Sequence, residues 1–143
     1  MLTNQATLVV NQPVEKVFSF VTQFENRPKW CQGTLESRQT SAGTIDVGTT
    51  FHEVFELFLG RKGEADYKVT EYEPNKRFVF ASTSGLVLAK ETLTFETSSK
   101  RTRITLATDA VFRRFKLIEP LFKGMGQRML AGNLARLRNE LER

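Results

Sequence analysis

Residues 87–97 read VLAKETLTFET, residues 98–101 read SSKR and residues 102–112 read TRITLATDAVF. This stretch decides the fold, because folding the first segment back on the third about the second places Phe95 opposite Ile104 and gives one apolar face. The same register makes these further pairs: Leu93 with Leu106, Ala89 with Ala110, Val87 with Phe112, Glu96 with Arg103 and Lys90 with Asp109. The charge pairs on the polar face support a pairing chosen from the apolar residues, so a β-hairpin is predicted.

The alternation of apolar and polar residues continues back to Thr49, which predicts five consecutive antiparallel strands. Turns are expected at 59–61 and 72–75, with a two-residue turn at Ser84-Gly85. These turns predict the following pairs: Phe55 with Ala65, Glu53 with Tyr67, Phe80 with Ala89 and Phe78 with Glu91. The apolar positions then share one inner face.

The flanking segments complete an antiparallel α+β pattern in a single domain, 1–143. Leu2–Val10 alternates like a strand, and apolar residues in 14–21 recur at helical spacing. A second helical turn or an ordered loop is expected over 24–31, followed by a polar edge strand at 35–40. A long helix is predicted at about 115–142. The expected architecture is a curved seven-stranded sheet against a C-terminal helix, with two short helices after the first strand.

The predicted C-terminal helix carries two apolar stripes. Ile118, Phe122, Met125 and Met129 form the first, and Leu130, Leu134, Leu137 and Leu141 form the second. The second series starts one residue after the first ends, which rotates the stripe by about 100°. The helix must therefore face two surfaces or kink near Gly132. We expect the first half to cover the concave sheet and the second half to pack against the sheet's end or the short helices.

Composition excludes several classes of protein. The chain has 143 residues, and its one cysteine, Cys31, and one histidine, His52, argue against a disulfide and against a metal site. No cofactor is expected. No apolar run approaches the ~20 residues of a membrane helix, and residues 1–10 do not resemble a signal peptide. We therefore expect a soluble, cytoplasmic protein without stable membrane insertion.

Positive charge is concentrated at the C-terminal end. Residues 100–143 hold 11 basic and 4 acidic side chains, whereas residues 1–99 hold 10 and 12. A basic helix face attracts nucleic acid or an anionic membrane, but these charges are scattered around the helix without interleaved exposed aromatics. We expect a solvated face and no nucleic-acid partner. An interaction module using this face, through Arg136 and Arg138, is one alternative function, and a homodimer is compatible with the sequence.

Loose motifs along nearly the whole chain resemble the START-like superfamily, also called Bet v 1-like or SRPBCC, and within it the polyketide cyclase/dehydrase-like proteins. The motifs that carry the resemblance, in order, are Pro13–Phe18, Pro28-Lys29-Trp30, Gly48, Glu73-Pro74-Asn75 and Leu134–Leu137 before Glu142. The resemblance implies a helix-grip fold with a cavity for lipids, sterols, polyketides or hormones. It does not by itself imply an enzyme.

Two carboxylates fall in the inward phase of the predicted strands, where a charge is costly unless it is paired, hydrated or used. Glu53 lies between Phe51 and Phe55, and Glu91 has Thr108 as a cross-strand neighbour. Three strand spacings separate them, about 14 Å in a flat sheet, so they are not expected to form a glycosidase-like dyad. Glu53, Glu91 and Tyr67 are the candidate catalytic or ligand-orienting residues, and a bulge that turns either glutamate to solvent is the alternative.

The predicted function is the binding of a hydrophobic or amphipathic, lipid-like or polyketide-like molecule between the sheet and the helix. The predicted ligand-binding residues are Trp30, Phe51, Glu53, Phe55, Tyr67, Val69, Phe78, Phe80, Glu91, Leu93, Leu106, Thr108, Phe112, Ile118, Phe122, Met125 and Met129. The alternative enzyme is a cyclase or dehydratase in which the cavity glutamates and the tyrosine move protons. His52 is expected on the outward face opposite Lys68, and Cys31 is expected to be a buried, inert thiol despite the nearby Arg27.

Overall fold

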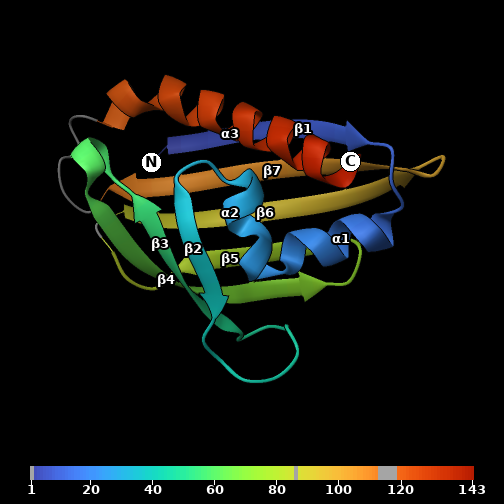
Figure 1. The fold of residues 1–143 in the computed structure, drawn as a ribbon, viewed down its shortest axis with the longest axis horizontal. Helices are drawn as coiled ribbons and strands as arrows, with labels where there is room; N and C mark the ends of the chain where they lie inside the picture. Colours follow the sequence, from blue (N-terminus) through green and yellow to red (C-terminus); the bar gives the residue numbers. More distant parts are fainter. Residues whose placement is uncertain (1, 86, 113–118) are drawn as a thin grey trace.

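A computed structural model describes residues 2–85, 87–112 and 119–143 (Figure 1). Its strands are β1 (Leu2–Val10), β2 (Thr34–Gln39), β3 (Thr50–Glu56), β4 (Lys62–Glu73), β5 (Arg77–Ser82), β6 (Val87–Ser98) and β7 (Arg101–Phe112). Its helices are α1 (Val14–Thr22), α2 (Arg27–Trp30) and α3 (Glu119–Leu141), with short 3-10 turns η1 (Phe24–Asn26) and η2 (Phe58–Gly60). No helix among the described residues is long and apolar enough to cross a membrane.

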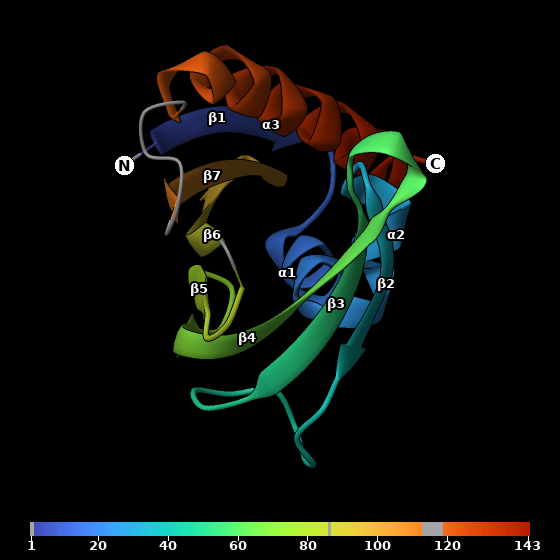
Figure 2. The ribbon, with the colours of Figure 1, turned by 90° about the vertical axis from the view of Figure 1, so that its left-hand side faces the viewer.

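The seven strands form one antiparallel sheet in the order β1-β7-β6-β5-β4-β3-β2. Figure 2 shows this sheet curling around α1, while α3 lies along β1. The chain leaves β1 at one edge, forms α1, η1 and α2, and enters β2 at the opposite edge. The predicted α+β helix-grip architecture, with its short helices after the first strand, is confirmed.

The β6–β7 hairpin has the predicted register. All six predicted pairs are observed, from Phe95 with Ile104 on the apolar face to Lys90 with Asp109 on the polar face. An ion pair of 3.7 Å joins the Arg103 guanidinium to the Glu96 carboxylate. The apolar alternation and the opposed charges were therefore sufficient to fix this pairing.

Two other hairpins differ from the predicted register by two residues. The β3–β4 turn is centred on Leu59, whose φ of 60° is left-handed, so Phe55 pairs with Gly63 and Glu53 with Ala65. The β5–β6 connection lies between Ser82 and Val87 and is longer than the predicted two-residue turn, and Glu91 pairs with Phe80. A register shift of two residues keeps every side chain on its predicted face of the sheet, because side chains along a strand alternate between the two faces.

Helix α3 faces two surfaces without interruption at Gly132. The second stripe is buried, with Leu137 0% exposed, and packs with the core, whereas Met125 and Met129 are 56% and 48% exposed. Of the first stripe, Ile118 lies outside the described residues, as does the side chain of Phe122. The helix runs along β1 and contacts α2, which agrees with the prediction for its second half.

Contacts at both ends of β1 fix the position of α3. A Cβ atom at Gly126 would lie 2.6 Å from Nδ2 of the buried Asn4, so the helix backbone approaches the strand closely at this position. At the other end, Gln12 Nε2 donates to the Leu141 carbonyl over 2.8 Å, and the Asn11 backbone N–H donates to the Glu142 carboxylate over 2.9 Å. The helix is therefore tied to the sheet through its C-terminal turn.

The core lies between the concave face of the sheet, the short helices and the second half of α3. Phe24 of η1 fills its middle, with its ring stacked on Phe51 at 3.5 Å between centroids and edge-on to Phe80 at 6.5 Å. This aromatic cluster occupies much of the space that the sequence assigned to a ligand. The remaining cavity is displaced toward the first half of α3.

Candidate functional site

A cavity of about 740 Å³ opens between β3, β4, the loop before β2 and α3. Its walls combine apolar and polar side chains, and Glu53, which is 3% exposed, lies at its inner end. The described lining residues are Gln32, Gly33, Thr34, Glu53, Phe55, Glu56, Leu57, Tyr67, Met125, Arg128 and Met129. Five of these, namely Glu53, Phe55, Tyr67, Met125 and Met129, were predicted from the sequence to lie at the ligand site.

A buried arginine connects this cavity to the second predicted glutamate. Arg27, at the start of α2, donates from Nε to the Glu53 carboxylate, and its Nη1 lies 3.3 Å from Oε2 of Glu91. Its guanidinium carbon is 5.0 Å from the ring centre of Phe80 and 5.8 Å from that of Trp30. Ion pairing and cation–π contacts together hold the charge in the interior. The two glutamates are bridged across four strands by one side chain.

Burial and the neighbouring charges set the protonation of this cluster. Burial lowers the pKa of Arg27, but the acidic groups around it, Cys31, Glu53 and Glu91, raise it well above the ordinary value, so the guanidinium stays charged. Burial raises the pKa of Glu91 against the opposing effect of Arg27, and the neighbouring Glu53 raises it further. The pKa of Tyr67 is also raised, first by burial and then by the two carboxylates, so its hydroxyl is protonated at neutral pH.

Three buried polar atoms around the cluster have no hydrogen-bond partner among the described residues. They are Trp30 Nε1, Glu91 Oε2 and Thr108 Oγ1. Glu91 and Thr108 are cross-strand partners on the concave face. The Glu91 oxygen lies within ion-pair distance of Arg27 without hydrogen-bond geometry. Buried polar groups are rarely left unpaired, so these atoms mark a place where further hydrogen bonds are available.

Most of the apolar residues predicted to contact a ligand belong to the packed core. Their exposed fractions do not exceed 2%, and they do not line the cavity: Trp30, Phe51, Val69, Phe78, Phe80, Leu93 and Leu106. The side chain of Phe112 lies outside the described part of the chain. Phe24 packs against Phe51 and Phe78 in the space that the sequence assigned to a ligand, so the described cavity has fewer apolar lining residues than predicted, and ligand contact by the other residues stays a prediction.

Arg27 is the functional residue that sequence reasoning missed. It lies in the segment 24–31, whose pattern predicts only a helical turn or a loop, and the sequence indicates a role for it only as a neighbour of Cys31. That thiol is buried, and burial raises its pKa to about 12 despite the opposing effect of Arg27, so it is a neutral thiol at neutral pH. The usable signal was the need of two inward-facing carboxylates for a buried cation.

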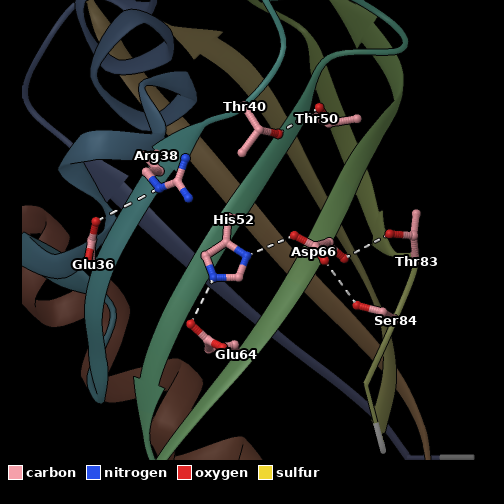
Figure 3. Close-up of polar contacts among 9 residues, drawn as sticks. All are labelled: Glu36, Arg38, Thr40, Thr50, His52, Glu64, Asp66, Thr83 and Ser84. Carbon is pink, nitrogen blue, oxygen red and sulfur yellow. Dashed lines mark hydrogen bonds and ion pairs between the residues drawn. The ribbon is translucent and has the colours of Figure 1, made fainter.

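His52 lies on the outer face of the sheet, as predicted, but its partner differs. Its Nδ1 is 2.8 Å from an oxygen of Asp66, and its Nε2 is 3.3 Å from Glu64 (Figure 3). Ser84 also donates to Asp66, over 3.4 Å. The pKa of His52 is raised, chiefly by the hydrogen bond to Asp66. None of the residues in this network lines the cavity as the structure describes it.

A second, smaller cavity of about 440 Å³ lies between α1, the loop after β2 and the turn after β4. Its two carboxylates, Glu15 and Glu25, are exposed to solvent, and its described lining contains no buried charge. The buried charged cluster therefore distinguishes the larger cavity as the candidate site.

A curved sheet with a C-terminal helix along its edge strand, and a cavity between them that ends at buried polar groups, defines a ligand-binding scaffold of the helix-grip type. Residues 1–142 match the family described as polyketide cyclase / dehydrase and lipid transport, and the chain belongs to this family. The resemblance seen in the sequence is confirmed. No curated protein matches the chain.

Solved structures share the fold at low sequence identity. A START superfamily protein from Mycobacterium smegmatis superposes with a TM-score of 0.83 at 14% identity, over 98% of this chain and 97% of that chain. The Zhui aromatase/cyclase from Streptomyces sp. R1128 gives 0.82 at 13% identity, over 99% and 93%. The protein TTHA0849 from Thermus thermophilus gives 0.75 at 18%, over 98% and 94%. At these identities the likeness shows the fold alone.

Proposed function

We propose that this protein binds a small hydrophobic or amphipathic molecule in the larger cavity. The observation that carries the proposal is the combination of apolar walls with the buried Arg27–Glu53–Glu91 cluster at the inner end. The walls bury an apolar body, and the polar groups orient it. Glu53 and the protonated hydroxyl of Tyr67 face the cavity directly, whereas Arg27 holds the position of Glu53.

Native mass spectrometry of protein purified from its own host tests the proposal, because a bound apolar molecule adds a defined mass. Thr34→Trp places an indole in the cavity wall and should abolish co-purification of that molecule. Arg38→Trp, on the outer face of the same strand, is the matched control and should retain it. An unliganded wild type that also fails to bind apolar dyes would contradict the proposal.

A second candidate function is acid–base catalysis of the cyclase or dehydratase type. It is favoured by the raised pKa of Glu91, since burial moves this carboxyl toward the pH range in which a general acid or base works. Tyr67 keeps its hydroxyl proton near the same cluster and can donate a hydrogen bond to a substrate oxygen. Under this function, Glu91→Gln abolishes turnover of a poly-β-ketone thioester while folding is spared. A binding protein without catalysis would show no turnover in either form and would only change its ligand preference.

A further inference from the structure

The buried cluster contains one positive and two negative side chains. Arg27 is the cation, and Glu53 and Glu91 are the carboxylates. The two other titratable groups beside it are neutral at pH 7, because the Cys31 thiol and the Tyr67 hydroxyl both have raised pKa values. The cavity is also lined by Glu56 and Arg128, whose formal charges are equal and opposite. With both carboxylates ionised, the buried cluster would lack one positive charge, and since an uncompensated buried charge is strongly unfavourable, either a proton on Glu91 or a further cation must supply it.

The missing charge lies at a definite place. Arg27 is hydrogen-bonded to Glu53, whereas Glu91 Oε2 has only its 3.3 Å ion-pair contact with Arg27 Nη1 and no further donor within the described ranges. Directly across the strand pair, Thr108 Oγ1 is also unpartnered there. One fifth of the Glu91 side chain is accessible, whereas its Oε2 and the Thr108 Oγ1 are themselves buried. Two buried acceptor oxygens with unused hydrogen-bonding capacity thus lie side by side, next to Arg27 and beyond Glu53 from the cavity.

We infer that the polar end of the ligand is a protonated amine that lies against Glu91 and Thr108. This inference rests on the proposed function, since it names the chemical class of the molecule in the same site. An ammonium group supplies both the missing positive charge and three donors, whereas a hydroxyl supplies one donor and no charge. A carboxylate would add a third negative charge to the cluster. The apolar part would extend past Glu53 toward Phe55, Met125 and Met129 at the mouth.

Without such a cation, a proton on Glu91 would provide the compensation, and burial raises the pKa of this residue in that direction. An ammonium group at the same place would displace that proton. Amine binding should therefore release a proton and weaken as the pH falls through the pKa of Glu91. Binding of a neutral alcohol should not change in this way.

Three probes with one chain length separate the headgroups: decylamine, 1-decanol and decanoate, measured by isothermal titration calorimetry near pH 7. We expect decylamine to bind about 10-fold or more tightly than decanol, a difference of about 1.4 kcal/mol, and decanoate to bind most weakly. Glu91→Gln should remove the preference for the amine and leave decanol binding nearly unchanged. Glu96→Gln, on the outer face of the same strand, is the control and should bind like the wild type.

The outcomes distinguish the two proposals. Binding of none of the three probes would count against the pocket itself. Equal or tighter binding of decanol or decanoate would overturn the amine inference and leave the pocket intact. Thr108→Val removes the second acceptor at constant shape, so if Glu91→Gln does not fold, a selective loss of decylamine affinity in this variant supports the inference and an unchanged preference overturns it.

Discussion

Replacing Arg27 with methionine should destabilise the protein strongly near neutral pH. The change leaves the Glu53 and Glu91 carboxylates buried without a cation, while methionine keeps an unbranched apolar side chain in the same space. Removing one partner of a buried ion pair costs about 3–5 kcal/mol, a large part of the about 5–15 kcal/mol that stabilises a typical domain. Adding Glu53→Gln and Glu91→Gln should recover most of the loss, because no buried charge then remains in the cluster.

Urea unfolding followed by fluorescence measures this loss, since Trp30 is the only tryptophan and is 1% exposed. Without Arg27 the folded protein holds protons on its carboxylates more tightly than the unfolded chain, so the stability of the variant rises as the pH falls. The loss should therefore be smaller near pH 5 than near pH 7. Arg77→Met breaks an exposed ion pair with Glu71 and should cost at most about 1 kcal/mol. A loss no larger than this control, or an equal loss at both pH values, would refute the reasoning.

Two further predictions concern the helix and the outer face of the sheet. Leu137→Ala should lower the free energy of unfolding in urea by about 2–5 kcal/mol, and Met129→Ala by less than about 0.5 kcal/mol. Similar losses in the two variants would contradict the assignment of a buried and an exposed apolar stripe to α3. His52 is the only histidine, so its NMR titration is resolved, and its pKa should lie above the ordinary 6.5 because of its hydrogen bond to Asp66. The stability from this contact is present below the unfolded pKa and is lost as the pH rises through the folded one. Asp66→Asn should return the pKa toward the ordinary value, and an unchanged titration would count against that hydrogen bond.

The register of β6 and β7 could be predicted because apolar alternation and opposed charges constrained the same alignment. The β3–β4 and β5–β6 registers could not, because they depend on where the chain reverses. The left-handed conformation of Leu59 moves the first turn by one residue, and the second connection is longer than the Ser84-Gly85 dipeptide suggested. Which face each residue occupies was still predicted correctly, since both errors were even numbers of residues.

The candidate site could be predicted only in part for a different reason. Alternation along a strand identifies Glu53 and Glu91 as inward-facing, but it does not reveal which distant residue neutralises them. The distance estimated for a flat sheet was too long for the two carboxylates to share a partner. Both contact Arg27 because the sheet curls and the long arginine side chain reaches both. In the same way, the position of Phe24 on the concave side of the sheet depends on how the segment before β2 crosses from one edge of the sheet to the other. The strand pattern contains no information on that crossing.

The crossing of residues 11–33 between the two edges of the sheet also affects how the protein folds. Arg27 emerges from the ribosome long before Glu91, so a nascent chain holds its guanidinium in water until β6 has been synthesised. Bringing Arg27 and Glu91 together closes a long loop, which lowers the entropy of the chain before any contact forms. Topologies dominated by such distant contacts fold in milliseconds to seconds, about a thousandfold slower than helical bundles. The three charges therefore lose their hydration together, in the step that closes the sheet, and we expect that step to set the folding rate.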